Sequence, residues 1–381
     1  MIYFDNSATT RTLKAAADRA YDCMTQQYFN PAAAYHEAYA VEKQVNEARA
    51  FNASLLGCSK DEIIYTSGGT ESNNTAIFGS LNAMHGMKRI VTTETEHPSV
   101  YETILTAAKR FNMEVVFAPL NPNGTVCIDR LSDVLNCETG LVSIMHVNNE
   151  LGSVNDLDAI ARKVRSLSPY AVFHSDGVQA FMKTPPKKLP VDLYSVSAHK
   201  LHAPKGVGFL FVRNGLHFAG GQIGGGQERN LRSGTTNVPG VLGFDAALRE
   251  YAENLNAWHM QMYRVKMRLY QQLHAIPDVY VNGPAPEDGA VHILNLSFLG
   301  VRGEVLLHAL EQQNVIVSTG SACAAKKQGK NRVLNAIGVV GQRQESAIRF
   351  SFSPFNTEQE ADEAAGIIAD QLSVLRRYKR R

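Results

Sequence analysis

The sequence predicts an α/β protein built around a mainly parallel sheet. Short, continuous apolar runs end in polar clusters, as in "LVSIMHVNNE" (141–150) and "AVFHSDGVQ" (171–179). Segments with helical periodicity lie between such runs, for example "SVYETILTAAKRF" (99–111) and "DLDAIARKVRSL" (156–167). Continuous apolar strands that alternate with amphipathic helices are typical of a parallel sheet covered on both faces.

The same pattern recurs along the first two thirds of the chain. The further runs are "EIIYTSGGTESN" (62–73), "RIVTTETEH" (89–97), "EVVFAPLN" (114–121), "LYSVSAHK" (193–200) and "GVGFLFVR" (206–213). After about residue 240 the pattern changes to a long polar helical stretch and the strand-like "AVHILNLSFLG" (290–300). Since 381 residues exceed the usual size of one hydrophobic core, two domains are expected.

We therefore predict three parts of the chain. Residues 1–15 form an N-terminal arm that packs with the small domain. Residues 16–245 form the large domain, which contains the predicted parallel sheet. Residues 246–381 form a smaller α+β domain.

Composition excludes several classes of protein. Apolar residues make up 44% and charged residues 19%, as in ordinary soluble globular proteins. No apolar run approaches the roughly 18–20 residues of a membrane-spanning helix. The N-terminus has no basic region followed by an apolar stretch. We expect a cytoplasmic protein with no membrane partner.

Charge argues against a nucleic-acid-binding body. The net charge is +2, but the terminal "RRYKRR" alone carries five positive charges, which leaves the rest of the chain slightly acidic. Direct nucleic-acid binding is not expected. The basic end is either a solvated helix terminus or a contact for a phosphate or a partner.

The cysteines suggest neither disulfides nor a metal site. There are five, and none are arranged as CxxC: Cys23, Cys58, Cys127, Cys137 and Cys323. An odd, scattered set argues against a disulfide framework and against zinc. No metal is expected.

Polar side chains gather where the predicted strands end. They are Thr70, His97, Asn148, Asp176 with Gln179, and Lys200. Ligands of parallel α/β sheets bind beyond the carboxyl ends of the strands. These ends together therefore predict a binding site.

Lys200 and Asp176 together favour pyridoxal phosphate (PLP). A lysine at the buried end of a strand has a lowered pKa and can form a Schiff base. A carboxylate such as Asp176 keeps the pyridine nitrogen of PLP protonated. The glycine turn "TSGGTESNN" (66–74) could hold the phosphate at a helix N-terminus. Alone, a surface lysine and a common Gly-Gly turn would explain these residues equally well.

Further motifs identify a family. In chain order they are "YFDNSATT", "TSGGTESNN", "TETEH", "SIMHVNNELG", "HSDGVQ", "SAHK…PKGVG", "GGGQERNLRSGT", "STGSAC" and "AIRFSFSPFNT". Over some 350 residues the chain resembles the NifS/IscS-type cysteine desulfurases, PLP enzymes of the class V aminotransferase group. The resemblance implies PLP fold type I, in which a mainly parallel seven-stranded sheet lies between helices, beside a smaller α+β domain.

The resemblance also implies roles for the matching residues. Lys200 would form the Schiff base, Asp176 would pair with the pyridine nitrogen, and Gln179 would contact the ring oxygen. His97 would stack on the ring and help to move protons. The phosphate would be bound by Gly69, Thr70, Ser197 and His199, with Thr235 from the other subunit of a homodimer. Asn148 and Arg349 would hold the substrate carboxylate, although a solvated strand charge is the alternative for Arg349.

The family's nucleophile would be Cys323, in "STGSACAAKKQGKN" (318–331). The implied reaction converts L-cysteine to L-alanine and leaves a persulfide on Cys323 for a sulfur acceptor. Nearby cations would lower the pKa of the thiol. The cations Lys326, Lys327, Lys330 and Arg332 either dock an acidic protein or RNA phosphate, or are solvated loop charges.

Two departures from the family bear on the acceptor. Loops of this length tend to be Ser-rich, whereas this one is rich in lysine. Housekeeping members continue past "RRYKRR" into a tail that engages the iron–sulfur scaffold. By analogy, the acceptor is a protein such as a tRNA-thiolation enzyme, with iron–sulfur cluster assembly as the other destination. The alternatives to a cysteine desulfurase are a selenocysteine lyase, an ordinary aminotransferase, and a sulfur-carrier docking protein with weak turnover.

Overall fold

The structure, a computed structural model, describes residues 1–184, 188–320 and 331–378. Within this part, the main sheet has seven strands in the order β2-β8-β7-β6-β5-β3-β4. The strands are β2 (Ile63–Thr66), β3 (Arg89–Thr92), β4 (Glu114–Phe117), β5 (Thr139–Ser143), β6 (Val172–Asp176), β7 (Leu193–Ser197) and β8 (Gly208–Val212). Only β8 runs antiparallel to its neighbours, so the predicted mainly parallel sheet is confirmed.

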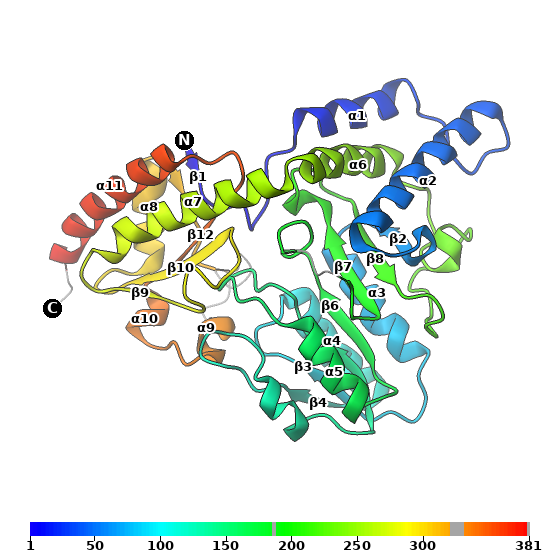
Figure 1. Ribbon diagram of the computed structural model, residues 1–381, viewed down its shortest axis with the longest axis horizontal. Helices are drawn as coiled ribbons and strands as arrows, with labels where there is room; N and C mark the ends of the chain where they lie inside the picture. The colour runs from blue at the N-terminus through cyan, green and yellow to red at the C-terminus, as the bar shows by residue number, and fades with distance from the viewer. Residues whose placement is uncertain (185–187, 321–330, 379–381) are drawn as a thin grey trace.

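Helices cover both faces of this sheet, as Figure 1 shows. They are α1 (Lys14–Thr25), α2 (His36–Leu56), α3 (Gly69–Asn82), α4 (Pro98–Phe111), α5 (Leu157–Leu167) and α6 (Val238–Glu253). Side chains of β2 alternate between the two faces, as a pleated strand requires. Ile64 packs with α3 and α4, whereas Ile63 and Tyr65 belong to the core beneath α2, α5 and α6.

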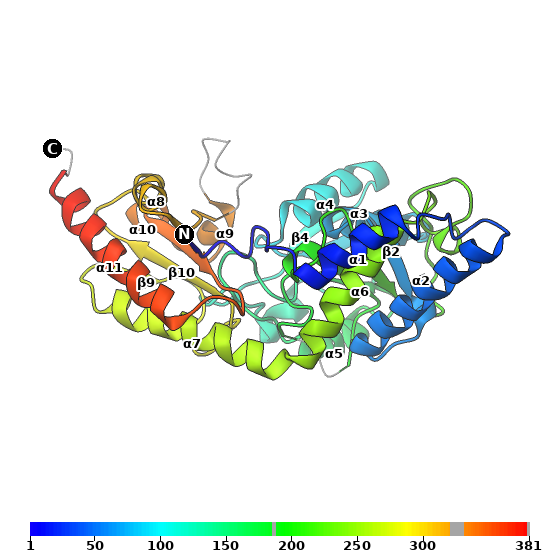
Figure 2. The ribbon, with the colours of Figure 1, turned by 90° about the horizontal axis from the view of Figure 1, so that it is seen from above.

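The C-terminal part is built on a second, antiparallel sheet with the strand order β12-β10-β9. Its strands are β9 (Val279–Val281), β10 (Ile293–Phe298) and β12 (Ala347–Ser351); its helices are α7 (Leu255–His274), α8 (Gly303–Gln312), α9 (Arg332–Ala336), α10 (Gln342–Glu345) and α11 (Glu358–Leu375). Leu296, Phe350 and Ile368 are fully buried in a separate hydrophobic core. Helices α7 and α11 pack side by side over this sheet (Figure 2).

The first residues connect the two sheets. Strand β1 (Ile2–Tyr3) pairs in parallel with β11 (Val315–Ile316), and Phe4 is buried in the C-terminal core. The chain then crosses to the main sheet, where the Thr10 amide donates to the carbonyl of His199 (3.0 Å). Figure 2 shows this crossing segment between the two parts.

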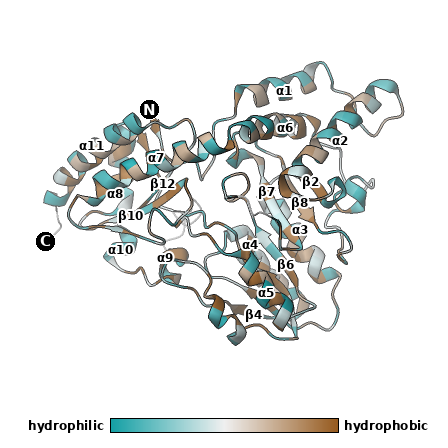
Figure 3. Ribbon diagram, in the orientation of Figure 1, coloured by the Kyte–Doolittle hydropathy of each residue, from teal (hydrophilic) through white to brown (hydrophobic). Residues whose placement is uncertain are grey.

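Short 3₁₀ turns complete the described structure. They are η1 (Lys60–Glu62), η2 (Ile128–Asp133), η3 (Ala198–Lys200), η4 (Glu228–Asn230) and η5 (Arg376–Tyr378). Figure 3 shows that the helices carry hydrophilic residues along much of their length. None of the helices in the described residues combines the length and apolar character needed to cross a bilayer.

Candidate active site

A cavity of about 310 Å³ opens at the carboxyl ends of the main-sheet strands. Its walls come from the N-terminal segment, the starts of α3 and α4, the ends of β6 and β7, and β12. The lining residues include Ser7, Ala8, Gly69, Thr70, Asn73, His97, Ser99, Asn149, Asp176, Gln179, Ser197, His199, Lys200, Gly320 and Arg349. Most of the residues predicted from separate strand ends therefore meet in one cavity, of the size that holds a small ligand.

Lys200 lies at the end of the short turn η3, directly after β7. Its Nζ donates to the carbonyl oxygens of Ser7 (2.8 Å) and Ala8 (2.6 Å). Burial and, to a smaller extent, the nearby Arg349 lower the pKa of this amine, Asp5 and Asp176 oppose the shift, and the resulting pKa is about 8. A lysine with such a pKa is neutral often enough near neutral pH to act as a nucleophile.

Asp176 ends β6 and is held in a fixed orientation. One carboxylate oxygen accepts from Asn73 Nδ2 (2.8 Å), and the other accepts from the Val178 amide (2.9 Å). The side chain is nearly fully buried, and these two donors fix the position of both of its oxygen atoms. A buried carboxylate aimed at this cavity suits a cationic ring nitrogen.

His97 caps the N-terminus of α4. Its Nδ1 accepts from the Ser99 amide (3.1 Å) and lies 2.8 Å from Ser99 Oγ. Burial lowers the pKa of His97, which keeps the imidazole uncharged at neutral pH. The ring is thus a fixed, neutral surface on the cavity wall that can accept a proton.

The start of α3 forms an anion-binding corner. Gly68 has φ +141°, a conformation that favours glycine. A Cβ on Gly69 would lie 2.7 Å from Val178 Cγ2, so only glycine fits without a shift. Thr70 and Ser197 line the same cavity. The unpaired amides of a helix N-terminus and nearby hydroxyls favour a phosphate group here.

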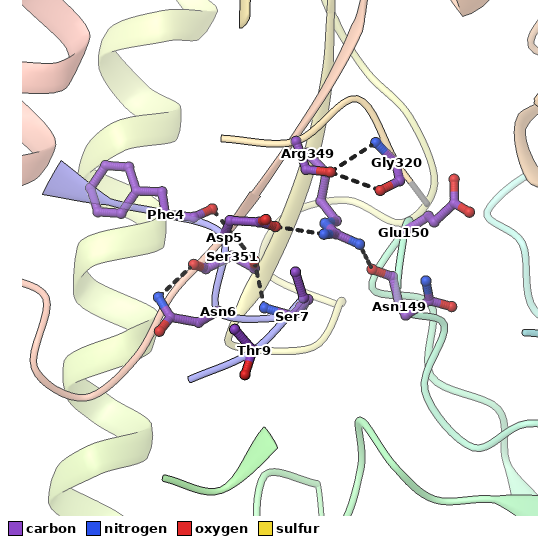
Figure 4. A network of polar contacts seen from close by, with 12 residues as sticks. Phe4, Asp5, Asn6, Ser7, Thr9, Asn149, Glu150, Gly320, Arg349 and Ser351 are labelled. Atoms are coloured by element: carbon purple, nitrogen blue, oxygen red, sulfur yellow. Dashed lines mark hydrogen bonds and ion pairs between the residues drawn. The ribbon is translucent and has the colours of Figure 1, made fainter. Parts of the chain in front are cut away.

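Arg349 of β12 is buried, with 3% of its surface exposed. Its Nη2 pairs with Asp5 Oδ1 (2.6 Å), and its Nη1 donates to the carbonyl of Asn149 (3.0 Å). Figure 4 shows this network, with the guanidinium held between the N-terminal segment and the turn that contains Asn149. The alternative of a solvated strand charge is therefore wrong.

The structure does not place the side chain of Asn148 on the cavity wall. Its Oδ1 accepts from the amides of Glu150 (2.9 Å) and Leu151 (2.8 Å), and its Nδ2 donates to the Thr95 carbonyl (2.9 Å). This amide is committed to the turn after β5. The next residue, Asn149, lines the cavity instead.

One other predicted residue does not line the cavity, and another lies outside the described residues. Thr235 is exposed in the segment before α6 and is absent from the cavity lining. Cys323 lies outside the described residues, as do Lys326, Lys327 and Lys330. Gly320, three positions before Cys323, does line the cavity.

Sequence reasoning missed three kinds of site residue. Ser7 and Ala8 contribute backbone carbonyls, which leave no signature in residue type. Asn73 could have been found, because it lies three positions after Thr70 on a helix and so shares its face. Asn149 differs from the predicted Asn148 by one position in an "NN" pair.

Comparisons with known proteins agree with this geometry. The profile of the family "Aminotransferase class-V" matches residues 2–363, and the chain belongs to this family. Cysteine desulfurase IscS of Photorhabdus laumondii is 38% identical over 383 residues, covering 98% of this chain and 93% of the relative. The NifS/IcsS protein homolog of Lactobacillus delbrueckii subsp. bulgaricus is 37% identical, covering 95% of each.

Solved structures are similar too. One described as "NIFS-LIKE PROTEIN" has a TM-score of 0.91 at 33% identity and covers 98% of this chain and 99% of that one. Another, "SspA in complex with cysteine", has a TM-score of 0.81 at 26% identity, with 94% and 100% covered. Within its family, then, the chain is similar to cysteine desulfurases, and the resemblance seen in its motifs is confirmed.

Enzymes of this family depend on PLP, and the cavity residues fit that cofactor. Lys200 would supply the amine for its aldehyde, Asp176 the partner for its ring nitrogen, and the start of α3 the donors for its phosphate. The Asn73 Oδ1 and Ser7 Oγ atoms are buried here without a hydrogen-bond partner in the described structure. Such orphaned polar atoms are typical of a site that binds a polar ligand.

The lowered pKa of Lys200 predicts a pH-dependent stability. Between pH 8 and 10.5 the unfolded chain binds more protons at Lys200 than the folded chain does, so the free energy of unfolding rises with pH. In cofactor-free protein, we expect wild type to gain about 2–3 kcal/mol more than Lys200→Met across this window. Urea denaturation at several pH values measures this, with the exposed Lys14→Met as control. Parallel curves for wild type and Lys200→Met would contradict it.

Proposed function

We propose that this chain is a cysteine desulfurase that uses PLP to convert L-cysteine to L-alanine and a persulfide on Cys323. The observation that carries the proposal is the meeting of Lys200, Asp176 and Arg349 in one cavity whose lining includes Gly320. Similarity to cysteine desulfurases over nearly the whole chain supports the same reaction.

Two residues would hold the cofactor for chemistry. Lys200 attaches it through a neutral amine, and Asp176 keeps its ring nitrogen protonated. When bound in this way, PLP withdraws electrons from the Cα of the substrate. The amine of Lys200 would also be the group placed to move a proton at the Cα of the substrate.

Residues at the other end of the cavity would orient the substrate. Arg349 offers a planar set of donors for the substrate carboxylate. Its contacts with Asp5 and the Asn149 carbonyl hold that plane in place. We assign to Asn149, rather than Asn148, the place beside this carboxylate. His97, neutral and fixed by Ser99, can accept a proton from the bound substrate.

The sulfur transfer needs a second thiol. The Cys323 thiolate attacks the substrate sulfur, a sulfur–sulfur bond forms, and the bond from sulfur to Cβ breaks. The electron pair stays with the substrate, which takes up protons and leaves as L-alanine. An acceptor thiol then takes the outer sulfur from Cys323. tRNA thiolation and iron–sulfur cluster assembly are the two destinations that we consider.

Replacing the nucleophile tests this reaction. In Cys323→Ser, alanine formation from L-cysteine should fall about 10²-fold or more, because no thiolate remains to take the sulfur. The matched control is the exposed Cys137→Ser, which should keep wild-type turnover. Undiminished alanine release in Cys323→Ser would reject the desulfurase mechanism. Selenocysteine cleavage that persists there beside lost cysteine turnover would favour the lyase alternative.

A homodimer is the second part of the proposal. Thr235 is exposed and does not line the cavity of its own chain, which suits a contribution to a partner's phosphate site. Exposed apolar side chains, among them Tyr21 on α1, Tyr28 after it, and Ile223, are available for an interface. A contiguous apolar patch formed by such groups would mark an interaction surface.

Dilution tests the dimer. If the partner's Thr235 completes the site, activity per chain should fall together with the dimer fraction as the protein is diluted. Sedimentation velocity and turnover measured at matched concentrations would show this. Full activity in a demonstrated monomer would refute the shared site.

Further assignments complete the proposal. We divide the chain into the arm 1–15, a large domain 16–245 and a small domain 246–381, which the two separate hydrophobic cores support. We place the activity in the cytoplasm, where thiols stay reduced; the four cysteines among the described residues are all free thiols.

A further inference from the structure

The segment just before residue 321 is fixed to the strand that carries Arg349. Ser318 and Arg349 exchange two backbone hydrogen bonds, of 3.2 and 2.6 Å. Ser318 Oγ also donates to the Gly320 carbonyl (2.7 Å). The described chain therefore reaches Gly320 in a defined place, on the wall of the cavity.

The segment that starts at residue 331 is also held by several hydrogen bonds. Asn331 is the N-cap of α9, and its Oδ1 accepts from the Leu334 amide (2.9 Å). Its carbonyl accepts from Gln344 Nε2 (2.9 Å). Its side-chain Nδ2 donates to Glu150 Oε2 at 2.7 Å.

These two ends meet at the carboxylate of Glu150. A Cβ on Gly320 would lie 2.7 Å from Glu150 Oε2 and 2.9 Å from Asn331 Nδ2. Gly320 also has φ +117°, which favours glycine. The contact between Glu150 and Asn331 thus leaves room only for a glycine beside it. Figure 4 shows Glu150 and Gly320 next to the Arg349 network.

Glu150 is itself held in place by the turn after β5. Its amide donates to Asn148 Oδ1 (2.9 Å), its carbonyl accepts from Asn295 Nδ2 (3.1 Å), and the residue is 4% exposed. Asn148, which the sequence assigned to the substrate, instead orients the turn that presents Glu150. A buried carboxylate with a charge-assisted hydrogen bond makes a strong fixed point.

Arg332, the residue after Asn331, is also engaged. Its Nη2 donates to the Glu96 carbonyl (2.6 Å), and its guanidinium carbon lies 3.8 Å above the Tyr101 ring. Glu96 directly precedes His97, so this contact joins the start of α9 to the part of the cavity wall that contains His97. Arg332 is therefore not one of the loop charges available to a docking partner.

We propose that Glu150 and Asn331 form an anchor that joins the two ends of residues 321–330 at the cavity rim and so act as positioning residues for the Cys323 thiol. The inference rests on the proposed function, because it requires Cys323 to be the nucleophile. A loop whose ends are joined at the reaction site pays its closure entropy in advance. Small displacements of a reacting group can slow a step as much as 10²-fold.

The decisive variant is Asn331→Asp. Aspartate still caps α9, but it places a second carboxylate against Glu150. The double variant Glu150→Gln/Asn331→Asp restores a donor opposite an acceptor, with the polarity exchanged. Asn331→Ser also keeps a cap and removes the donor without adding charge, and it takes over the test if Asn331→Asp does not fold. Asn335→Asp, on the exposed side of the same helix, is the matched control.

Three readouts separate positioning from general damage. Peptide mass spectrometry after rapid quenching gives the single-turnover rate of persulfide formation on Cys323. Exchange of the Cα hydrogen of L-alanine in D₂O reports the Lys200 chemistry without a thiol step. Hydrogen exchange of residues 318–320 and 331–336 in cofactor-free protein reports the anchor itself.

For Asn331→Asp we expect persulfide formation at least about tenfold slower, alanine exchange within twofold of wild type, and faster hydrogen exchange at both loop ends. The double variant should recover persulfide formation to within about threefold, and Asn335→Asp should match wild type. Unchanged persulfide formation in Asn331→Asp would overturn the anchor, and so would equal losses in both reactions without rescue. Failure of the proposed function is distinct, since Cys323→Ser would then retain cysteine turnover.

Discussion

The active site depends on how two buried cations are compensated by the N-terminal segment. Lys200 follows β7 of the main sheet, Arg349 lies in β12 of the second sheet, and both face the same cavity. Unpaired buried charges are costly, and residues 5–8 supply what both need. Asp5 pairs with Arg349, and the carbonyls of Ser7 and Ala8 accept from Lys200. A short arm thereby joins the cofactor end of the cavity to the carboxylate end.

Backbone geometry supplies the rest of the cavity. Parallel strands bring their carboxyl ends to one edge, so Asp176 and Lys200 meet although 24 positions separate them in sequence numbering. Glycines at the start of α3 and at Gly320 let the main chain approach the ligand space closely. A glycine is also needed at the anchor, because Gly320 passes Glu150 too closely for a side chain to fit.

Local patterns were enough to predict the main sheet and the residues at its strand ends. Lys200, Asp176, His97 and Thr70 follow directly from apolar runs, and all four line the cavity. Local patterns could not show which of the adjacent asparagines Asn148 and Asn149 lines the cavity. The conformation of the turn after β5 decides this, and the local sequence does not specify that conformation. The carbonyls of Ser7 and Ala8 could not be predicted either, since every residue has one and their partner lies some 190 positions away.

Two predictions concern parts of the protein outside the described residues of a single chain. Thr235 requires a second subunit, and the role of Cys323 falls on residues outside the described ranges. The structure nevertheless limits the chemistry, because Gly320 lies on the cavity wall and Asn331 is fixed near it. The proposed nucleophile, Cys323, belongs to the part of the chain between these two points.

The central claim is that sulfur passes from L-cysteine to Cys323. Peptide mass spectrometry of the PLP-loaded enzyme, after L-cysteine is added, tests it most directly. The account predicts one extra sulfur atom on the Cys323 peptide and an equal amount of L-alanine in solution. An unmodified Cys323 in an enzyme that still consumes L-cysteine would contradict it.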